Sequence, residues 1–253
     1  MRSPWIECFH PNPQARLRLF CFPYAGGSAA IFRLWHKHLP PDVEVCPVEL
    51  PGRGGRFKEK PFDRLDPLLE ALQEVFVPLC GEKPFAFFGH SLGALIGFEL
   101  SRWLRRTENL HPSLLCISAY GPPRRLSPDR FRYHDAPEGR FLDKMKKMNG
   151  TPVEVLQNPE VMALFLPILR ADLAIADFYE YVDEAPLDCP IFAIGGENDE
   201  EVNPSLVSEW GRETAADFRW KLFRGNHFFL HSASEEVLKE LSRSLSRIVG
   251  EEG

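Results

Sequence analysis

FAFFGHSLGALIGFEL, at Phe85–Leu100, joins a short apolar run to a long amphipathic segment through Gly89 and Gly93. The run Phe85–Phe88 is short, aromatic and uncharged, which predicts a buried strand. In Leu92–Arg106 apolar residues recur at steps of three and four, which predicts a helix. A buried strand followed by a tight turn and a helix is the repeating unit of a parallel sheet.

The rest of the chain repeats this alternation of short apolar runs and longer amphipathic stretches. The other strands are expected at Arg16–Phe22, Val43–Val48, Leu114–Ala119, Ile191–Ile194 and Phe218–Phe223. The other helices are expected at Ile31–His38, Leu65–Leu79, Pro204–Ala215 and Ser234–Val249, with Asn203 and Ser234 as caps. The pattern predicts an α/β fold with a mainly parallel central sheet flanked by helices.

The alternation is interrupted between residues 121 and 186, where no buried strand is evident. Four amphipathic pieces are expected there, at Gly139–Met148, Pro152–Gln157, Pro159–Leu169 and Arg170–Tyr181. We interpret this region as a helical lid inserted over the sheet rather than as a separate domain. The chain is therefore expected to form a single domain over residues 1–253.

Composition excludes several classes of protein. The formal net charge of −6 disfavours general binding to nucleic acid or to an anionic membrane, both of which need a basic surface. The six cysteines have no metal-ligand spacing and lie in or beside apolar runs, so we expect reduced core thiols. Neither a signal peptide nor a membrane-spanning segment is expected, which favours a cytoplasmic location.

Gly89-His90-Ser91-Leu92-Gly93 has the form G-x-S-x-G and lies where the strand ends and the helix begins. A serine on so sharp a turn leaves no space for Cβ atoms at the flanking positions, which explains both glycines. Ser91 is therefore the candidate nucleophile. The alternative is an ordinary glycine-rich turn without chemistry.

A serine hydroxyl needs a base to accept its proton and a carboxylate to orient that base. His227 follows the strand Phe218–Phe223 and is the candidate base, while His231 is expected to be structural. Asp199 follows the strand Ile191–Ile194 and is the candidate acid, with Glu197 as the alternative. The order serine, acid, histidine resembles that of the α/β-hydrolase fold.

Acyl transfer also needs N–H donors for the oxyanion that forms during attack. The backbone N–H of Leu92 follows the nucleophile and is one candidate. The second is the N–H of Ala25, in the loop Phe22–Ser28 after the first strand. Gly26-Gly27 in that loop can alternatively serve only to form a turn.

Six segments of the sequence, some of which contain the candidate residues named above, resemble those of a known family. They are FPYAGG at Phe22–Gly27, ELPGRGGRF at Glu49–Phe57, FFGHSLGALIGFEL at Phe87–Leu100, NGTP at Asn149–Pro152, LPILRADL at Leu166–Leu173 and GNHFFL at Gly225–Leu230. Together they resemble the type II thioesterases of polyketide and nonribosomal peptide biosynthesis. Tyr24, Gly55 and Asn226 depart from the residues that are frequent in that family, and Tyr24 and Asn226 border the expected site.

The resemblance implies a stand-alone editing hydrolase that removes stalled or aberrant acyl groups from the phosphopantetheine arms of acyl or peptidyl carrier proteins. It maps the family's catalytic residues onto Ser91, Asp199 and His227, and its oxyanion donors onto the backbones of Ala25 and Leu92. The partners would be carrier proteins, and no metal or organic cofactor is implied beyond the arm that the substrate carries. A carboxylesterase or lipase, an acyltransferase and a non-catalytic scaffold of the same fold remain alternatives.

The insertion offers candidates for substrate contact. An acyl tunnel could be lined by Phe131, Phe141, Met145, Met148, Leu164, Phe165 and Phe178, or these residues could form only the core of the lid. Tyr24 and Phe228 are expected to border the same pocket. The basic stretch of Arg124, Arg125, Arg130, Arg132, Lys144, Lys146 and Lys147 is a candidate docking surface for an acidic carrier protein, or is simply solvated.

Overall fold

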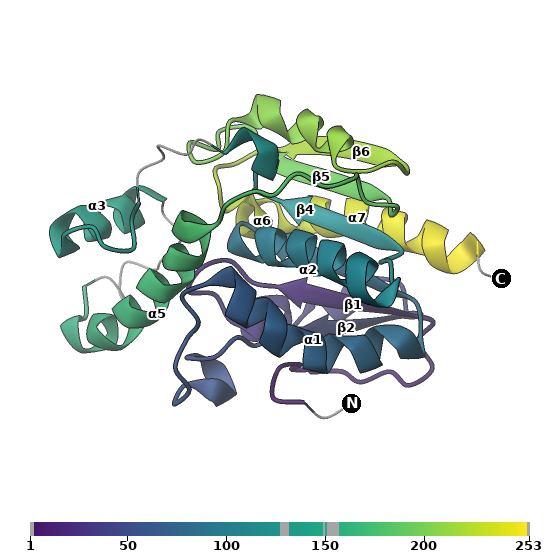
Figure 1. Cartoon of the computed structure of the whole chain (residues 1–253), viewed down its shortest axis with the longest axis horizontal. Coiled ribbons are helices and arrows are strands. Elements are labelled where there is room, and N and C mark those ends of the chain that lie inside the picture. The colour runs from purple at the N-terminus through teal and green to yellow at the C-terminus, as the bar shows by residue number, and fades with distance from the viewer. Residues whose placement is uncertain (1–2, 127–131, 149, 151–156, 252–253) are drawn as a thin grey trace.

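A computed structural model describes residues 3–126, 132–148, 150 and 157–251. Six parallel strands form one sheet in the order β2-β1-β3-β4-β5-β6 (Figure 1). The strands are β1 (Leu17–Phe22), β2 (Val43–Pro47), β3 (Phe85–His90), β4 (Leu114–Ser118), β5 (Ile191–Gly196) and β6 (Phe218–Phe223). All six expected strands are therefore present, and the predicted α/β class with a parallel sheet is confirmed.

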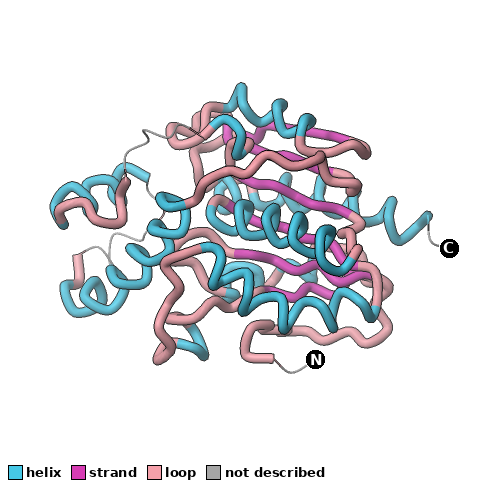
Figure 2. The backbone as a smooth tube through the Cα atoms, viewed as in Figure 1, coloured by secondary structure: helices cyan, strands magenta, loops and turns pink. Residues whose placement is uncertain are grey.

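Helices cover both faces of this sheet, as Figure 2 shows by their positions in front of and behind the strands. One face packs against α1 (Leu65–Glu82) and α2 (Leu92–Glu108), and the other against α7 (Ser234–Glu251), which follows the short α6 (Phe229–Ser232). Because both faces are covered, five of the strands are buried along their whole length and only the edge strand β6 is partly exposed. Among the described residues, no helix is both long and apolar enough to cross a lipid bilayer.

Two of the expected helices are of a different type. The expected helix Ile31–His38 is instead two short 3₁₀ segments, Ala29–Phe32 and Trp35–Lys37, in which hydrogen bonds span three residues rather than four. The expected helix Pro204–Ala215 is a 3₁₀ helix, Pro204–Arg212, whose Asn203 cap does accept a hydrogen bond from the Ser205 N–H.

Ser234 was expected as a cap and is instead the first residue of α7.

The insertion contributes α3 (Glu138–Met148) and α5 (Pro159–Phe178), which project beyond the end of the sheet (Figure 1). The two pieces expected at Pro159–Leu169 and Arg170–Tyr181 form the single helix α5, because Pro167 does not end it. The helix expected at Pro152–Gln157 lies almost wholly outside the described residues. Phe141, Met145 and Leu169 form a small core between α3 and α5.

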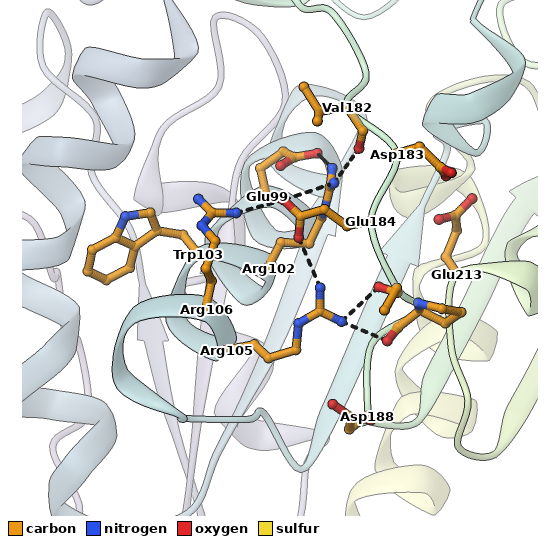
Figure 3. Close-up of polar contacts among 12 residues, drawn as sticks. Glu99, Arg102, Trp103, Arg105, Arg106, Val182, Asp183, Glu184, Asp188 and Glu213 are labelled. Carbon is orange, nitrogen blue, oxygen red and sulfur yellow. Dashed lines mark hydrogen bonds and ion pairs between the residues drawn. The ribbon is translucent and has the colours of Figure 1, made fainter.

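The chain returns from α5 to β5 through a segment that is bound to α2 by charged side chains (Figure 3). Arg105 of α2 donates to Glu184 and to the backbone oxygens of Ala185 and Pro186. Arg102 donates to Glu99 on its own helix and lies 3.2 Å from Glu184. The end of the insertion is thereby fixed to the helix that follows Ser91.

All six cysteines are free, and five of them are buried. Cys8 is half-buried. This agrees with the expected reduced core thiols.

Candidate active site

Ser91 occupies a strained turn between β3 and α2. Its φ of 53° lies in the left-handed region, which is unusual for a residue other than glycine. A Cβ on Gly89 would lie 2.1 Å from the carbonyl oxygen of Gly93, and a Cβ on Gly93 would lie 2.2 Å from that of Phe22. Both glycines of the G-x-S-x-G sequence are therefore required by close backbone approach, as expected from the sequence.

Three side chains from different strand ends meet at this turn. The Nε2 atom of His227 lies 3.0 Å from the Oγ atom of Ser91. The Nδ1 atom of the same ring lies 2.9 Å from Oδ2 of Asp199. His227 and Asp199 are buried, whereas Ser91 is partly exposed. The three expected residues thus form a continuous chain of hydrogen bonds that ends at an accessible hydroxyl.

Asp199 is fixed by the backbone of its own loop. Its Oδ1 atom accepts hydrogen bonds from the N–H groups of Glu201 (2.8 Å) and Val202 (3.0 Å), so that Oδ2 remains for His227. Glu197, the alternative acid, is exposed and two residues away. The structure therefore favours Asp199 as the residue that orients the imidazole.

Two further histidines lie near the triad. His90 is fully buried, with Nε2 3.0 Å from the carbonyl oxygen of His227 and Nδ1 2.8 Å from Oγ of Ser118. Burial, together with the neighbouring His227, holds the pKa of His90 well below its usual value. His231 accepts or donates a 2.9 Å hydrogen bond with the Tyr24 hydroxyl, and burial lowers its pKa. Both histidines thus form hydrogen bonds with residues that border the site.

The loop after β1 forms a four-residue turn beside Ser91. The Gly27 N–H donates to the carbonyl oxygen of Tyr24 at 2.8 Å, and Gly26 at the third position has a φ of 74°. These are the features of a type II turn. Among the described residues, no protein group accepts a hydrogen bond from the N–H of Ala25 or of Leu92. Both N–H groups expected as oxyanion donors are therefore free to bind substrate.

Two cavities open on either side of Ser91. The first has a volume of about 350 Å³ and a mainly apolar lining that includes Ala25, Ser91, Leu169 and Leu173. The second has a volume of about 550 Å³, and its lining includes His227 and several charged side chains. The hydroxyl of Ser91 therefore lies where an apolar and a more polar chamber meet.

Five of the six residues expected to contact substrate line these chambers. Tyr24, Phe165 and Phe228 line the apolar chamber, and Met145 and Met148 line both. Phe178 does not belong with them, and this expectation is corrected. Its ring packs between the guanidinium of Arg64 (3.4 Å) and the ring of His134 (4.4 Å), on a side of α5 that faces away from the chambers.

The other apolar residues of the insertion divide between core and surface. Phe141 is fully buried between α3 and α5, so it belongs to the insertion's own core. Leu164 is 58% exposed. Phe131 lies outside the described residues. A helical period locates the apolar residues of the insertion but does not tell which of them face a cavity.

Three of the seven cations in the basic stretch have acidic partners. Ion pairs join Arg124 to Glu213, Arg125 to Glu209 and Lys144 to Glu201. Of the remaining cations, Arg132 lies over the ring of Phe178, Lys146 and Lys147 are exposed on α3, and Arg130 lies outside the described residues. Because three of the cations are already paired, the expectation of a continuous basic docking surface is weakened.

Sequence reasoning missed two charged residues beside the site. Arg53 and Asp172 form a buried ion pair, with side chains 6% and 2% exposed, and Asp172 also accepts a hydrogen bond from the Gly26 N–H at 2.6 Å. A signal was present. Asp172 follows the run Leu166–Leu169 in α5, and a carboxylate at a buried position of an apolar helix needs a partner.

The arrangement is suited to nucleophilic attack on an acyl group. A hydroxyl paired with a neutral imidazole can attack a carbonyl carbon, and two free N–H groups nearby can bind the oxygen that becomes negatively charged. In the described part of the chain, His, Cys, Asp and Glu side chains form no cluster of three or more that could bind a metal ion.

Comparison with known proteins places these features in a family. A sequence model described as "Thioesterase domain" matches residues 17–245. The chain is 38% identical over 247 residues to the gramicidin S biosynthesis protein GrsT of Aneurinibacillus migulanus, a match that covers 98% of this chain and 96% of that protein. It is 36% identical over 241 residues to the thioesterase PikA5 of Streptomyces venezuelae, covering 95% and 85% of the two chains.

Solved structures agree with this result. The type II thioesterase BorB from the borrelidin biosynthetic cluster superimposes with a TM-score of 0.87 at 31% identity, covering 97% of this chain and 99% of that one. The resemblance indicated by the sequence motifs is confirmed by these matches.

Proposed function

Because the chain belongs to the thioesterase domain family and is a hydrolase of thioesters, we propose that Ser91, His227 and Asp199 cleave acyl groups from carrier proteins through an acyl-enzyme intermediate. The observation that carries this proposal is the hydrogen-bonded chain from Asp199 through His227 to Ser91. No metal or organic cofactor takes part in the proposed reaction.

In the first half of the reaction, Oγ of Ser91 attacks the thioester carbonyl carbon while Nε2 of His227 accepts its proton. The N–H groups of Ala25 and Leu92 bind the oxyanion. The carbon–sulfur bond then breaks, and the departing thiolate takes the proton from Nε2 of His227, which returns the imidazole to its neutral form. A thiol has a pKa near 8.5, far below that of an alcohol, so the leaving group needs little help from the imidazolium.

In the second half, His227 accepts a proton from water, and the resulting hydroxide equivalent attacks the Ser91 ester. The products are a carboxylic acid and free Ser91. Because this leaving group is an alkoxide and requires protonation, we expect deacylation to be the slower half-reaction.

The proposed substrate is an acyl or peptidyl group on the phosphopantetheine arm of a carrier protein. The names of the relatives support this, since they include a gramicidin S biosynthesis protein and a type II thioesterase of the borrelidin cluster. Similarity to a type II thioesterase supports a role in editing, the removal of stalled or aberrant groups. The apolar chamber beside Ala25 gives the acyl chain a place to bind.

The proposal is tested with acyl-loaded carrier proteins and intact-protein mass spectrometry. The chain should convert the acyl carrier to the free carrier, and Ser91→Ala should abolish that conversion while retaining the fold by circular dichroism. A fluorophosphonate should label the wild-type chain at Ser91. Continued hydrolysis by Ser91→Ala, or faster hydrolysis of a matched alkyl oxygen ester than of the thioester, would contradict the proposal.

A further inference from the structure

The ion pair between Arg53 and Asp172 binds three separate segments together. Arg53 lies in the loop after β2, Asp172 lies on α5, and both side chains contact the turn Tyr24–Gly27. Nη1 and Nη2 of Arg53 each donate to one carboxylate oxygen of Asp172 at 2.7 Å. Nη1 also donates to the carbonyl oxygen of Gly27 at 3.1 Å.

The carboxylate of Asp172 completes this arrangement by accepting the N–H of Gly26 at 2.6 Å. In a type II turn the peptide between the second and third residues has a defined orientation, which positive φ at the third residue permits. A flip of the Ala25–Gly26 peptide would point the Ala25 carbonyl oxygen at the carboxylate. Asp172 therefore holds the Ala25–Gly26 peptide in one of its two orientations by attraction and repulsion together. The Ala25 N–H belongs to the preceding peptide, so its direction is fixed indirectly, through the position that this contact gives to the Ala25 Cα.

This arrangement uses two of the three consecutive N–H groups in the turn. The Gly26 N–H binds Asp172 and the Gly27 N–H binds Tyr24. The Ala25 N–H is left without a protein acceptor among the described residues, and Ala25 lines the chamber that contains Ser91. The N–H groups of Gly26 and Gly27 thus hold the loop, and the N–H of Ala25 is left for the substrate.

Stability alone gives little reason for a charged pair at this position. Burying two charges removes both from water, and an apolar pair of similar volume is often as stable. The pair does supply directional bonds to the turn that apolar side chains cannot make. On this basis we propose that Asp172 and Arg53 are positioning residues for the oxyanion hole, which hold the Ala25 N–H toward the carbonyl oxygen bound at Ser91.

The inference rests on the proposed function, and it adds a dependence of catalysis on α5. Leu169 and Leu173, on either side of Asp172, line the apolar chamber. The same helix therefore forms a wall for the acyl group and fixes an oxyanion donor. Displacement of α5 from the core would weaken stabilisation of the transition state as well as open the chamber.

The decisive variant is Asp172→Asn, compared with Glu99→Gln as a matched control. Glu99 also accepts a hydrogen bond from a buried arginine, Arg102 (Figure 3), and a second one from the hydroxyl of Tyr179, just after α5. Glu99 lines neither of the two chambers beside Ser91. With a short acyl thioester of N-acetylcysteamine, Asp172→Asn should lower kcat about 10- to 100-fold and change KM less than threefold. Affinity for an alkylboronic acid, which forms a tetrahedral adduct with serine, should fall in parallel. Glu99→Gln should keep both within twofold.

A second variant keeps the test decisive if Asp172→Asn does not fold. Arg53→Met combined with Asp172→Leu replaces the ion pair by apolar side chains of similar length, so the fold should be retained in urea titration. Its kcat should stay lowered, because nothing accepts the Gly26 N–H. Recovery of kcat together with stability, or an equal fall of kcat in Glu99→Gln, would overturn the inference. The proposed function is judged separately, by the inactivity of Ser91→Ala.

Discussion

The carboxyl edge of the sheet and the helical insertion beyond it both border Ser91, but they are built on different principles. At the sheet edge, Ser91, Asp199 and His227 follow β3, β5 and β6, and parallel pairing brings the ends of these strands together. In the insertion, α3 and α5 share only the small core around Phe141 and project away from the sheet (Figure 1). The first region places atoms by backbone register, and the second places them by the packing of side chains.

This difference implies separate roles. Register places a hydroxyl 3.0 Å from one nitrogen of an imidazole and a carboxylate 2.9 Å from the other, as acyl transfer requires. The apolar side chains that α3 and α5 present to the apolar chamber include Met145 and Met148, and methionine packing tolerates change of shape. We therefore expect substitutions at the sheet edge to alter the rate of chemistry, and substitutions in the insertion to alter which acyl groups are accepted.

Asp199→Asn should have the largest effect, a fall in kcat of about 10³- to 10⁴-fold. Asparagine Oδ1 can keep the bonds from Glu201 and Val202, which leaves the amide NH₂ facing Nδ1 of His227. That group donates, so it selects the tautomer with a proton on Nε2, which cannot accept the Ser91 proton. The measurement is steady-state hydrolysis of a short acyl thioester.

The control for this prediction is Glu197→Gln, an equivalent change at the exposed acid two residues away. It should retain the wild-type rate. Comparable losses in the two variants would mean that the general charge of the loop matters and that the bond from Asp199 to His227 does not.

The sheet edge and the insertion also differ in how much of each could be predicted from the sequence. The triad could be predicted because short apolar runs such as Phe85–Phe88 mark strands, and chemistry follows their ends. The contact of α5 with the core could not be predicted, because helical periodicity indicates which face of a helix is apolar but not which residues that face contacts. Phe165 and Phe178 both lie on α5, yet only Phe165 lines one of the two chambers beside Ser91.

The missed ion pair has a related cause. Arg53 and Asp172 are 119 residues apart, and neither lies at the end of a strand beside the triad. The sequence showed each in a motif, but pairing across that distance depends on where α5 crosses the loop after β2. The local sequence indicates that a carboxylate at Asp172 needs a partner, but it does not indicate which residue supplies that partner.

Phe165→Ala should have a smaller effect that depends on the substrate. The Phe165 ring packs against the turn at Gly26 and narrows the apolar chamber, so its removal creates space and removes contact area. We expect kcat/KM for long or branched acyl chains to rise about tenfold relative to that for short ones. The measurement is a series of acyl thioesters of increasing length.

Leu164→Ala is the matched control for this change, because Leu164 is the preceding residue on α5 and is exposed. It should leave the profile of acyl preference unaltered. A uniform loss for all chain lengths in Phe165→Ala would instead show that the insertion acts on the chemistry, and the contrast between the two regions would fail.

His90→Gln should have the smallest effect, on stability and its dependence on pH. His90 lies under the site with Nε2 bonded to the His227 carbonyl oxygen, and burial holds its pKa well below the usual value near 6.5. Below pH 6.5 the unfolded chain therefore binds a proton that the folded chain does not, so stability falls as the pH falls. One such group contributes about 1 kcal/mol of loss in the free energy of unfolding between pH 7 and 5.5.

Glutamine retains a donor for the His227 carbonyl without titrating. The free energy of unfolding of His90→Gln in urea should therefore depend less on pH by that amount. Parallel curves for the two proteins would show that His90 titrates alike in the folded and unfolded chains, which would contradict a neutral, buried His90 beneath the triad.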